Sequence, residues 1–256
     1  MTYSVDLLPV GRTEVPGPQV FWMSDWFTTY PLCFQVALIR GSGVVALVNT
    51  GTAPDVSIHS GDDGFFGEGA HMSREEGEFI TDQLERYGVA PDQVTHIVLA
   101  PLTLYAAANV PLFSNAEIAI SRTGWIHFHT THRHPHDDHD ELLPPELIAH
   151  LVTDAWPRVR LLEDEDRLAP GIHTWWTGAH HRSSLCVEVE TATGTVAITD
   201  AVFVQENLDR SHPVGICSNL EEAILVERRL KSSGATVLPL YDPGNFDRFP
   251  GGVVAQ

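Results

Sequence analysis

The fold is decided by the stretch Val98-Leu-Ala-Pro-Leu-Thr-Leu-Tyr-Ala-Ala-Ala-Asn109, followed closely by Leu112-Phe-Ser-Asn-Ala116. The stretch begins inside an apolar run, Thr95 to Leu99, which predicts a buried strand. Before that run, Ser73-Arg-Glu-Glu76 has the pattern of a capping box and predicts the start of a helix, which Gly88 closes. The apolar residues of this helix are Phe79, Ile80, Leu84 and Tyr87.

Two further apolar runs precede this helix. Phe34 to Arg40 and Val44 to Asn49 lie on either side of Gly41-Ser-Gly43, which is typical of a β-hairpin. The second run ends in the turn Asn49-Thr-Gly51. A polar, glycine-rich loop from Ala53 to Ala70 follows it.

The second half of the chain has the same order of elements. Its predicted strands are Gly171 to Thr177, Leu185 to Glu190, Thr195 to Thr199 and Thr236 to Leu240. Asn219 predicts the cap of a helix that runs to about Ser233 and ends at Gly234. This repetition predicts an α/β domain over residues 1–256, with two stacked mixed sheets between helices. Two segments fall outside the pattern, an N-terminal extension of about 1–33 and a histidine-rich insert of about 125–141.

Composition excludes several classes of function. The 256 residues carry a formal net charge of −19, so an acidic chain of this kind is repelled by nucleic acids and anionic membrane surfaces. No apolar run approaches the roughly 18 residues of a membrane span, and no secretory signal is visible. The three cysteines, Cys33, Cys186 and Cys217, are odd in number and far apart, which favours a reducing cytoplasm.

Taken in order, these segments resemble the metallo-β-lactamase family. Asn49-Thr-Gly51 stands where that family usually has Asp-Thr-Gly, and residues 98–109 stand where it has Thr-His-x-His-x-Asp-His-x-Gly-Asn. Thr177-Gly-Ala-His180 resembles the Pro-Gly-His segment, and Ile198-Thr-Asp200 resembles the segment with the bridging aspartate. Pro239-Leu-Tyr241-Asp-Pro243 resembles the closing Pro-Gly-His-Asp-Pro.

The resemblance covers roughly residues 34–250 and implies the αββα sandwich of that family. The second half is most similar to the branch of acyl-homoserine-lactone lactonases and related lactone hydrolases. That branch uses a dinuclear zinc centre, which needs converging imidazole and carboxylate ligands.

Only some of the implied ligand positions hold side chains that bind metals. His180 and Asp200 remain, whereas five positions are occupied by side chains that are poor ligands or none: Pro101, Thr103, Tyr105, Ala106 and Tyr241. The sequence therefore predicts a lactonase-like protein that has lost its zinc pair, with no cofactor.

The resemblance also implies that the remaining polar side chains share one cleft. We expect His180, Asp200, Tyr105 and Tyr241 to be catalytic, with His180 as acid or base and the phenols as hydrogen-bond donors to a substrate oxygen. Thr103 is a further candidate for substrate binding. The alternative is structural: the phenols fill the space of the lost zinc, and His180 and Asp200 are remnants bonded to each other.

Four more residues are candidates for substrate contact. His181 and Arg182 follow His180, and a guanidinium there can bind an anionic group or pair with a surface acid. Phe65 and Phe66 lie in the glycine-rich loop, which in related lactonases caps the substrate; otherwise they cover the edge of the core.

The histidine-rich segment raises a metal alternative. Its histidines are His127, His129, His132, His134, His136 and His139. Short tracts of this kind bind metals, so His127 or His129 with His180 and Asp200 can form a site for one zinc, iron or manganese ion. The alternative is an exposed loop.

An aromatic cluster lies near the N-terminus, formed by Trp22, Trp26, Phe27 and Tyr30. We expect it to pack in the core or at a homodimer contact rather than to wall a pocket.

Three functions remain open. The leading one is a metal-independent enzyme that uses acid–base chemistry on a small cyclic or acyl metabolite. The second is a mononuclear metal hydrolase, and the third is a protein that binds a small molecule or acts as a scaffold without catalysis.

Overall fold

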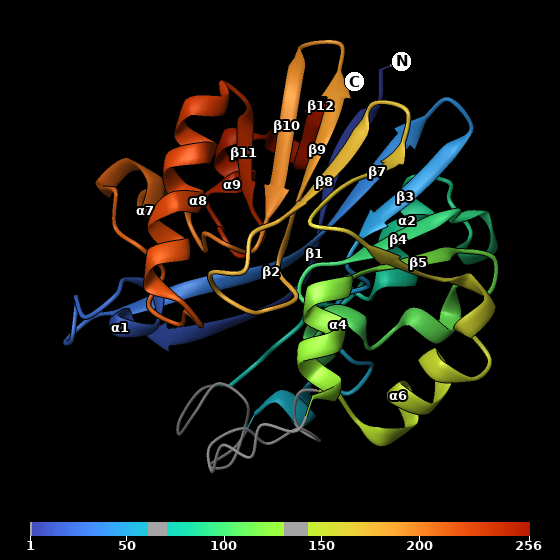
Figure 1. The fold of residues 1–256 in the computed structure, drawn as a ribbon, viewed down its shortest axis with the longest axis horizontal. Coiled ribbons are helices and arrows are strands. Elements are labelled where there is room, and N and C mark those ends of the chain that lie inside the picture. The colour runs from blue at the N-terminus through green and yellow to red at the C-terminus, as the bar shows by residue number, and fades with distance from the viewer. Residues whose placement is uncertain (1, 61–70, 131–142) are drawn as a thin grey trace.

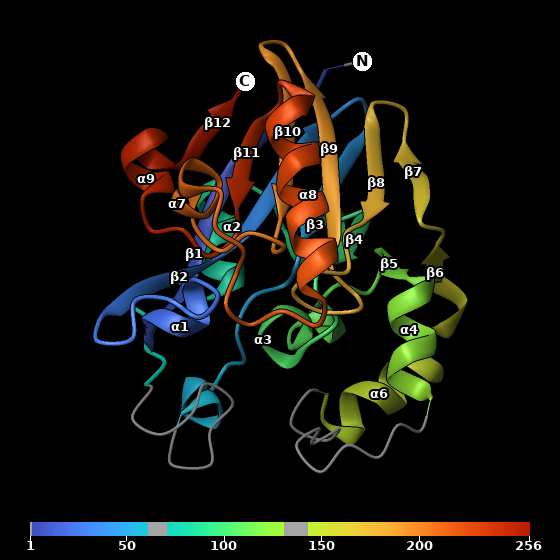
Figure 2. The ribbon, with the colours of Figure 1, turned by 60° about the vertical axis from the view of Figure 1, so that its left-hand side comes forward.

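A computed structural model describes residues 2–60, 71–130 and 143–256. Within these residues a seven-stranded sheet packs against a five-stranded sheet, and helices lie on the outside of both (Figures 1 and 2). The predicted sandwich of two mixed sheets flanked by helices is therefore confirmed.

The larger sheet has the strand order β12-β1-β2-β3-β4-β5-β6. In this order the strands are Val253–Ala255, Ser4–Pro16, Thr29–Gly41, Val44–Val48, His96–Leu99, Glu117–Ser121 and Val159–Leu162. The pairs from β3 to β6 are parallel, whereas β12, β1, β2 and β3 pair antiparallel.

The smaller sheet has the order β11-β10-β9-β8-β7. These strands are Thr236–Pro239, Gly194–Thr199, Leu185–Thr191, Ile172–Trp176 and Glu165–Ala169. Strands β10 and β11 are parallel, and the other pairs are antiparallel.

Short helices join these strands. The α-helices of the described residues are α1 (Gly17–Val20), α2 (Ile80–Arg86), α3 (Leu104–Ala107), α4 (Arg122–His129), α6 (Pro145–Val152), α7 (Gln205–Arg210), α8 (Leu220–Ser233) and α9 (Asn245–Arg248). The 3₁₀-helices are Val56–His59, Pro91–Gln93, Val110–Leu112, Trp156–Arg158 and Pro250–Gly252. Over the same residues, every helix is too short or too polar to span a bilayer.

The alternation of side chains along β9 explains the layers. Leu185, Val187 and Val189 lie in the core that the smaller sheet shares with the larger one. Cys186 points the other way and packs in a second cluster beneath α8. The members of this cluster from α8 are Ala223, Val226, and Leu230.

Helix α8 begins and ends as predicted. The side chain of Asn219 accepts a hydrogen bond from the Glu222 amide, and Gly234 adopts the left-handed conformation (φ +71°) that ends the helix.

The predicted start of the helix after the glycine-rich loop is wrong. Helix α2 begins at Ile80, because the backbone of Ser73 instead pairs with Arg12 of β1 through two hydrogen bonds. Gly77, in a left-handed conformation (φ +78°), separates this bridge from the helix.

The predicted N-terminal extension supplies β1, which lies between β12 and β2 in the larger sheet. β1 pairs with β2 along almost its whole length, with a bulge between Pro9 and Gly11. This strand was not predicted from the sequence.

Most of the aromatic cluster lies outside the core, so the first of our two expectations is wrong, whereas the second, a homodimer contact, stays a prediction. Trp22, Trp26 and Phe27 are exposed, and only Tyr30 of the four packs against the main core. The ring of Tyr30 contacts Phe21 edge-on at 5.1 Å.

Two asparagines fix the strand ends near the candidate site. The Asn49 side chain donates to the Ala100 carbonyl and accepts from the Ala100 amide, both at 2.8 Å. The Asn109 amide donates to the carbonyls of three consecutive residues, Thr50, Gly51 and Thr52. Because both asparagines are buried, these carbonyls have no access to water and depend on them.

We expect Asn109→Ala to lower the free energy of unfolding by about 1–3 kcal/mol, since it leaves buried carbonyls without donors. Denaturant unfolding measures this change. Asn115→Ala is the matched control, because exposed Asn115 donates to one carbonyl, that of Asp92. Equal losses for the two variants would contradict the role of Asn109.

Candidate functional site

The candidate site lies where several strands end. Asp200 follows β10 and Tyr241 closely follows the neighbouring parallel strand β11, in which Pro239 pairs with Thr199. Tyr105 lies in α3, in the connection after β4, and His180 lies in the loop between β8 and β9.

Three predicted site residues are in contact. The Tyr105 hydroxyl lies 3.4 Å from His180 Nε2, and the Tyr241 hydroxyl donates to the Tyr105 hydroxyl at 3.5 Å. Both distances are long for hydrogen bonds of this kind. The two phenols and the imidazole therefore form a loose chain from the core toward half-buried His180.

The backbone fixes the tautomer of His180. Nδ1 lies 2.8 Å from the Ile216 carbonyl oxygen, which can only accept, so Nδ1 carries the proton. Exclusion of water from the ring lowers the pKa of His180 to about 4. At neutral pH the ring is therefore uncharged, and its Nε2 lone pair faces the Tyr105 hydroxyl.

Phenylalanines surround the phenols. Phe34 of β2 contacts both rings, with centroid distances of 5.2 Å to Tyr105 and 5.1 Å to Tyr241. Phe203 contacts the ring of His180 at 4.7 Å and that of Tyr241 at 5.0 Å. Tyr105 and Tyr241 are only 5% and 3% exposed, and burial raises the pKa of each phenol.

Asp200 is fully buried and is bonded differently from what the structural alternative implies. Its Oδ2 accepts a hydrogen bond from Ser184 at 2.5 Å, whereas within the described part of the chain its Oδ1 has no partner in another residue. Burial without a cation raises the pKa of Asp200 to about 7. Both ring nitrogens of His180 have other partners, so the His180–Asp200 bond of the structural alternative does not form.

Thr103 and His181 adjoin these residues. Buried Thr103 is the N-cap residue of α3, the helix that carries Tyr105. The His181 Nδ1 lies 2.7 Å from the Ser183 hydroxyl. Burial, followed by the charges of His180, His127 and Arg182, lowers the pKa of His181 to about 3.

Arg182 has a structural partner. Its guanidinium forms a 2.5 Å ion pair with Glu222 and lies 4.5 Å from the centre of the Trp176 ring. These contacts match the second of our two interpretations, in which Arg182 pairs with an acid.

The structure describes two of the four remaining candidate residues. Phe65 and Phe66 lie outside the described residues. His127 and His129 lie in the last turn of α4, where the ring of His129 contacts Trp125 and Phe128. In the described segments, no group of three or more His, Cys, Asp or Glu side chains is placed to hold a metal ion.

These residues do not fit a dinuclear zinc centre. The Nε2 of His180 faces a phenol, and only His180 and Asp200 offer the imidazole and carboxylate donors that a zinc pair needs. Apart from these two residues, the ligand positions hold the side chains Pro101, Thr103, Tyr105, Ala106 and Tyr241.

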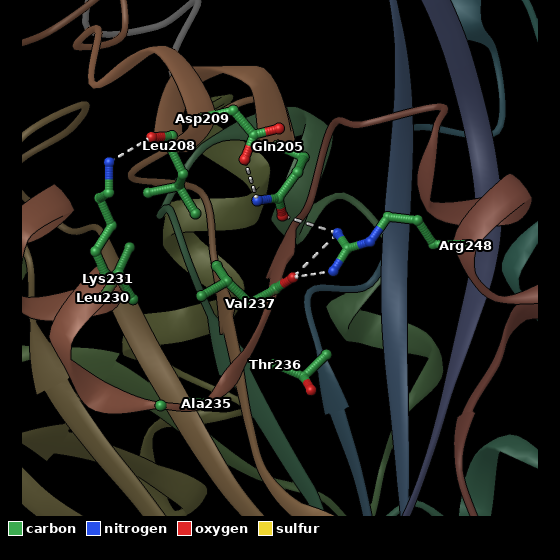
Figure 3. A pocket seen from close by; sticks show the side chains of 10 residues that line it. Gln205, Leu208, Asp209, Leu230, Lys231, Ala235, Thr236, Val237 and Arg248 are labelled. Atoms are coloured by element: carbon green, nitrogen blue, oxygen red, sulfur yellow. Dashed lines mark hydrogen bonds between the residues drawn. The ribbon is translucent and has the colours of Figure 1, made fainter.

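A surface pocket lies elsewhere in the molecule, between α7, α8, β11 and α9, with a volume of about 560 Å³ (Figure 3). None of the predicted site residues lines it. Its two cations already bond neutral groups: Lys231 donates to the Leu208 carbonyl, and Arg248 donates to the Val237 carbonyl and the Gln205 side chain.

Several partners in the site were not predicted from the sequence. The Ile216 carbonyl gives no signal in a sequence, because every residue has one. Ser184, which donates to Asp200, has no feature in the sequence that distinguishes it from other serines. Phe34 and Phe203 were not singled out.

Comparison with known proteins gives matches in structure only. No protein-family model matches the chain, and no curated protein does. An N-acyl homoserine lactone hydrolase with N-hexanoyl-L-homoserine bound at its catalytic metal centre matches with a TM-score of 0.79 and 22% identity, over 98% of this chain and 99% of that one. A probable metal-dependent hydrolase from Staphylococcus aureus matches at 0.74 and 14%, over 94% and 89%. The hydrolase AbOPH, of the beta lactamase superfamily, matches at 0.69 and 14%, over 99% and 89%.

The raised pKa of Asp200 predicts a pH-dependent stability. Between about pH 4 and pH 7 the folded carboxyl keeps its proton and the unfolded one loses it, so its contribution to stability falls as the pH rises. We expect Asp200→Asn to gain stability relative to wild type across this window, by up to about 4 kcal/mol.

Denaturant unfolding of both proteins at several pH values measures this difference. Asp247→Asn, at an exposed position, controls for the loss of one negative charge. A difference between Asp200→Asn and wild type that does not change between about pH 4 and pH 7 would show that the buried carboxyl is not neutral.

Proposed function

We propose, from the premise that this chain has the metallo-β-lactamase fold, that it is a metal-independent enzyme acting on a small cyclic or acyl metabolite. His180 is its acid–base residue, and Tyr105 donates a hydrogen bond to a substrate oxygen. Tyr241 and Asp200 support Tyr105 from the buried side.

One observation carries this proposal. Neutral His180 has its proton held on Nδ1 by the Ile216 carbonyl, and its basic Nε2 is directed at a hydroxyl group. A base in a fixed tautomer and within reach of a hydroxyl is the arrangement that general acid–base catalysis needs. When a substrate or water takes the place of the Tyr105 contact, Nε2 accepts its proton.

The phenols supply the second half of the chemistry. The Tyr105 hydroxyl, released from Nε2, is free to donate to a carbonyl oxygen on which negative charge develops. The hydrogen bond from Tyr241 to Tyr105 strengthens that donor. Asp200 affects both phenols electrostatically, and its neutral form avoids a negative charge beside the developing one.

The substrate class rests on the structural matches. One of them holds N-hexanoyl-L-homoserine, the opened form of a lactone, at its catalytic centre. A lactone or other acyl compound presents the carbonyl that the proposed donor and base require. Identity to that protein is 22%, so the comparison supports the compound class and not the individual substrate.

Most of the side chains at the site are poor metal ligands, which supports catalysis without a dinuclear centre. The alternative of one ion held by His180, Asp200, His127 and His129 has less support. In the described part of the chain, no three of these side chains lie close enough together to hold a metal ion. The ring of His129 instead contacts two aromatic side chains.

A second candidate function is a non-catalytic protein that binds a small molecule. The burial of both phenols against Phe34 supports it, because side chains that are 5% and 3% exposed have little surface to offer a substrate. Only half-buried His180 then contacts the ligand.

We expect His180→Gln to lower turnover of a lactone or acyl substrate about 10²- to 10⁴-fold, because glutamine cannot take the proton. A panel of lactones and esters, including N-acyl homoserine lactones, identifies the substrate on tag-free wild-type protein. His173→Gln, on β8, is the matched control and should retain activity, since His173 is remote from the Tyr105 contact.

A strong chelator separates the alternatives. We expect turnover to be unchanged after chelation and elemental analysis to find less than one bound ion per chain. Loss of turnover on chelation would instead favour the mononuclear metal hydrolase. A panel in which no compound turns over, but one raises the melting temperature, would favour the binding protein.

A further inference from the structure

We propose that Glu222 is a positioning residue for His180, because its carboxylate holds the loop that carries the imidazole. This inference rests on the proposed role of His180 as the acid–base residue. Glu222 does not touch the Tyr105–His180 pair and acts only through the backbone and Arg182.

The loop before His180 has an uncommon conformation. Gly178 (φ +56°) and Ala179 (φ +53°) are both left-handed, although alanine rarely adopts this conformation. Such a backbone persists only where its surroundings hold it, and the cost is on the order of 1–3 kcal/mol for a residue like Ala179. The direction of the His180 side chain depends on this turn.

One oxygen of Glu222 holds the turn from both sides. Oε2 accepts a hydrogen bond from the Ala179 amide at 3.2 Å and one from Arg182 Nη1 at 2.5 Å. These donors lie one residue before and two residues after His180. The same oxygen is so close to Gly178 that a Cβ there would overlap it, which explains the glycine.

Both ends of this bridge are fixed. Glu222 lies in the first turn of α8, where the Asn219 side chain accepts a hydrogen bond from the Glu222 backbone amide at 3.1 Å. The N-terminal end of the helix also favours the negative charge of the Glu222 carboxylate. Arg182 stacks on Trp176, whose indole donates to the Arg182 carbonyl at 2.7 Å. The ion pair is about three-quarters buried at both side chains, so solvent screens it less than a surface pair.

The segment before Glu222 bonds the same loop. Ser218 donates from its amide to the Ala179 carbonyl at 2.6 Å and from its hydroxyl to the His180 carbonyl at 3.0 Å. Ile216 accepts from the ring itself. Residues 216–222 therefore orient both the backbone and the imidazole of His180, and Glu222 contributes a charge to this contact.

The test compares Glu222→Ala with Glu222→Gln, which keeps an oxygen for both donors. Long-range ¹H–¹⁵N NMR reports the tautomer of His180, whose signals are assigned by their loss in His180→Gln. We expect Glu222→Ala to populate the Nε2–H tautomer and to lower kcat about 10- to 100-fold with KM changed less than about two-fold. Glu222→Gln should remain close to wild type in both measurements.

The chain offers a matched control and a milder variant. Arg229 pairs with Glu165 at 2.7 Å and lies 3.8 Å from the centre of the Trp175 ring, so Glu165→Ala removes the same kind of contact away from His180. This control should leave the tautomer and kcat unchanged. Glu222→Asp keeps the charge but retracts the oxygen, and it should show a smaller change of the same kind if Glu222→Ala does not fold.

A folded Glu222→Ala, or in its place Glu222→Asp, with the wild-type tautomer and kcat would overturn the inference and leave Glu222 a role in stability alone. The NMR measurement needs no substrate. If wild-type protein turns nothing over, the proposed function fails, whereas the effect of Glu222 on the His180 tautomer is still decided.

Discussion

The site depends on a constraint of the two sheets: parallel neighbouring strands end at the same edge. In the smaller sheet this rule brings Asp200, after β10, beside Tyr241, after β11. In the larger sheet it brings Asn49, after β3, to Ala100, after β4, and two hydrogen bonds join them. Tyr105 is then carried toward His180 by the connection that follows β4.

The sequence predicted correctly those helices whose ends depend only on neighbouring residues. Asn219 and Gly234 mark the ends of α8 through their own side chain and backbone conformation, so the sequence was sufficient. The start of α2 was predicted wrongly because Ser73 pairs with distant Arg12, which no pattern in residues 73–76 records. Strand β1 was missed because the bulge between Pro9 and Gly11 interrupts its alternation, and most of its side chains are buried on both faces.

The sequence was sufficient to predict which residues of the candidate site meet, but not which hydrogen-bond partners they have. The order of segments was sufficient to bring Tyr105, His180 and Tyr241 together. The partner of His180 is a backbone carbonyl, and the partner of Asp200 is a serine, neither of which a ligand pattern indicates. The sequence left open whether Trp22, Trp26 and Phe27 pack in the core or at a surface contact, since an aromatic residue in a sequence does not show which side of a turn it occupies.

The packing around the phenols limits how a metal centre could be engineered into this site. Phe34 contacts both Tyr105 and Tyr241, so exchanging either phenol for an imidazole would open a cavity in the cluster. After a single such exchange, the side chains of Pro101 and Ala106 would still offer no donor atom to a metal. Building a metal centre into this cluster therefore requires substitutions at several positions, and the exchange of either phenol costs packing energy before any ion can bind.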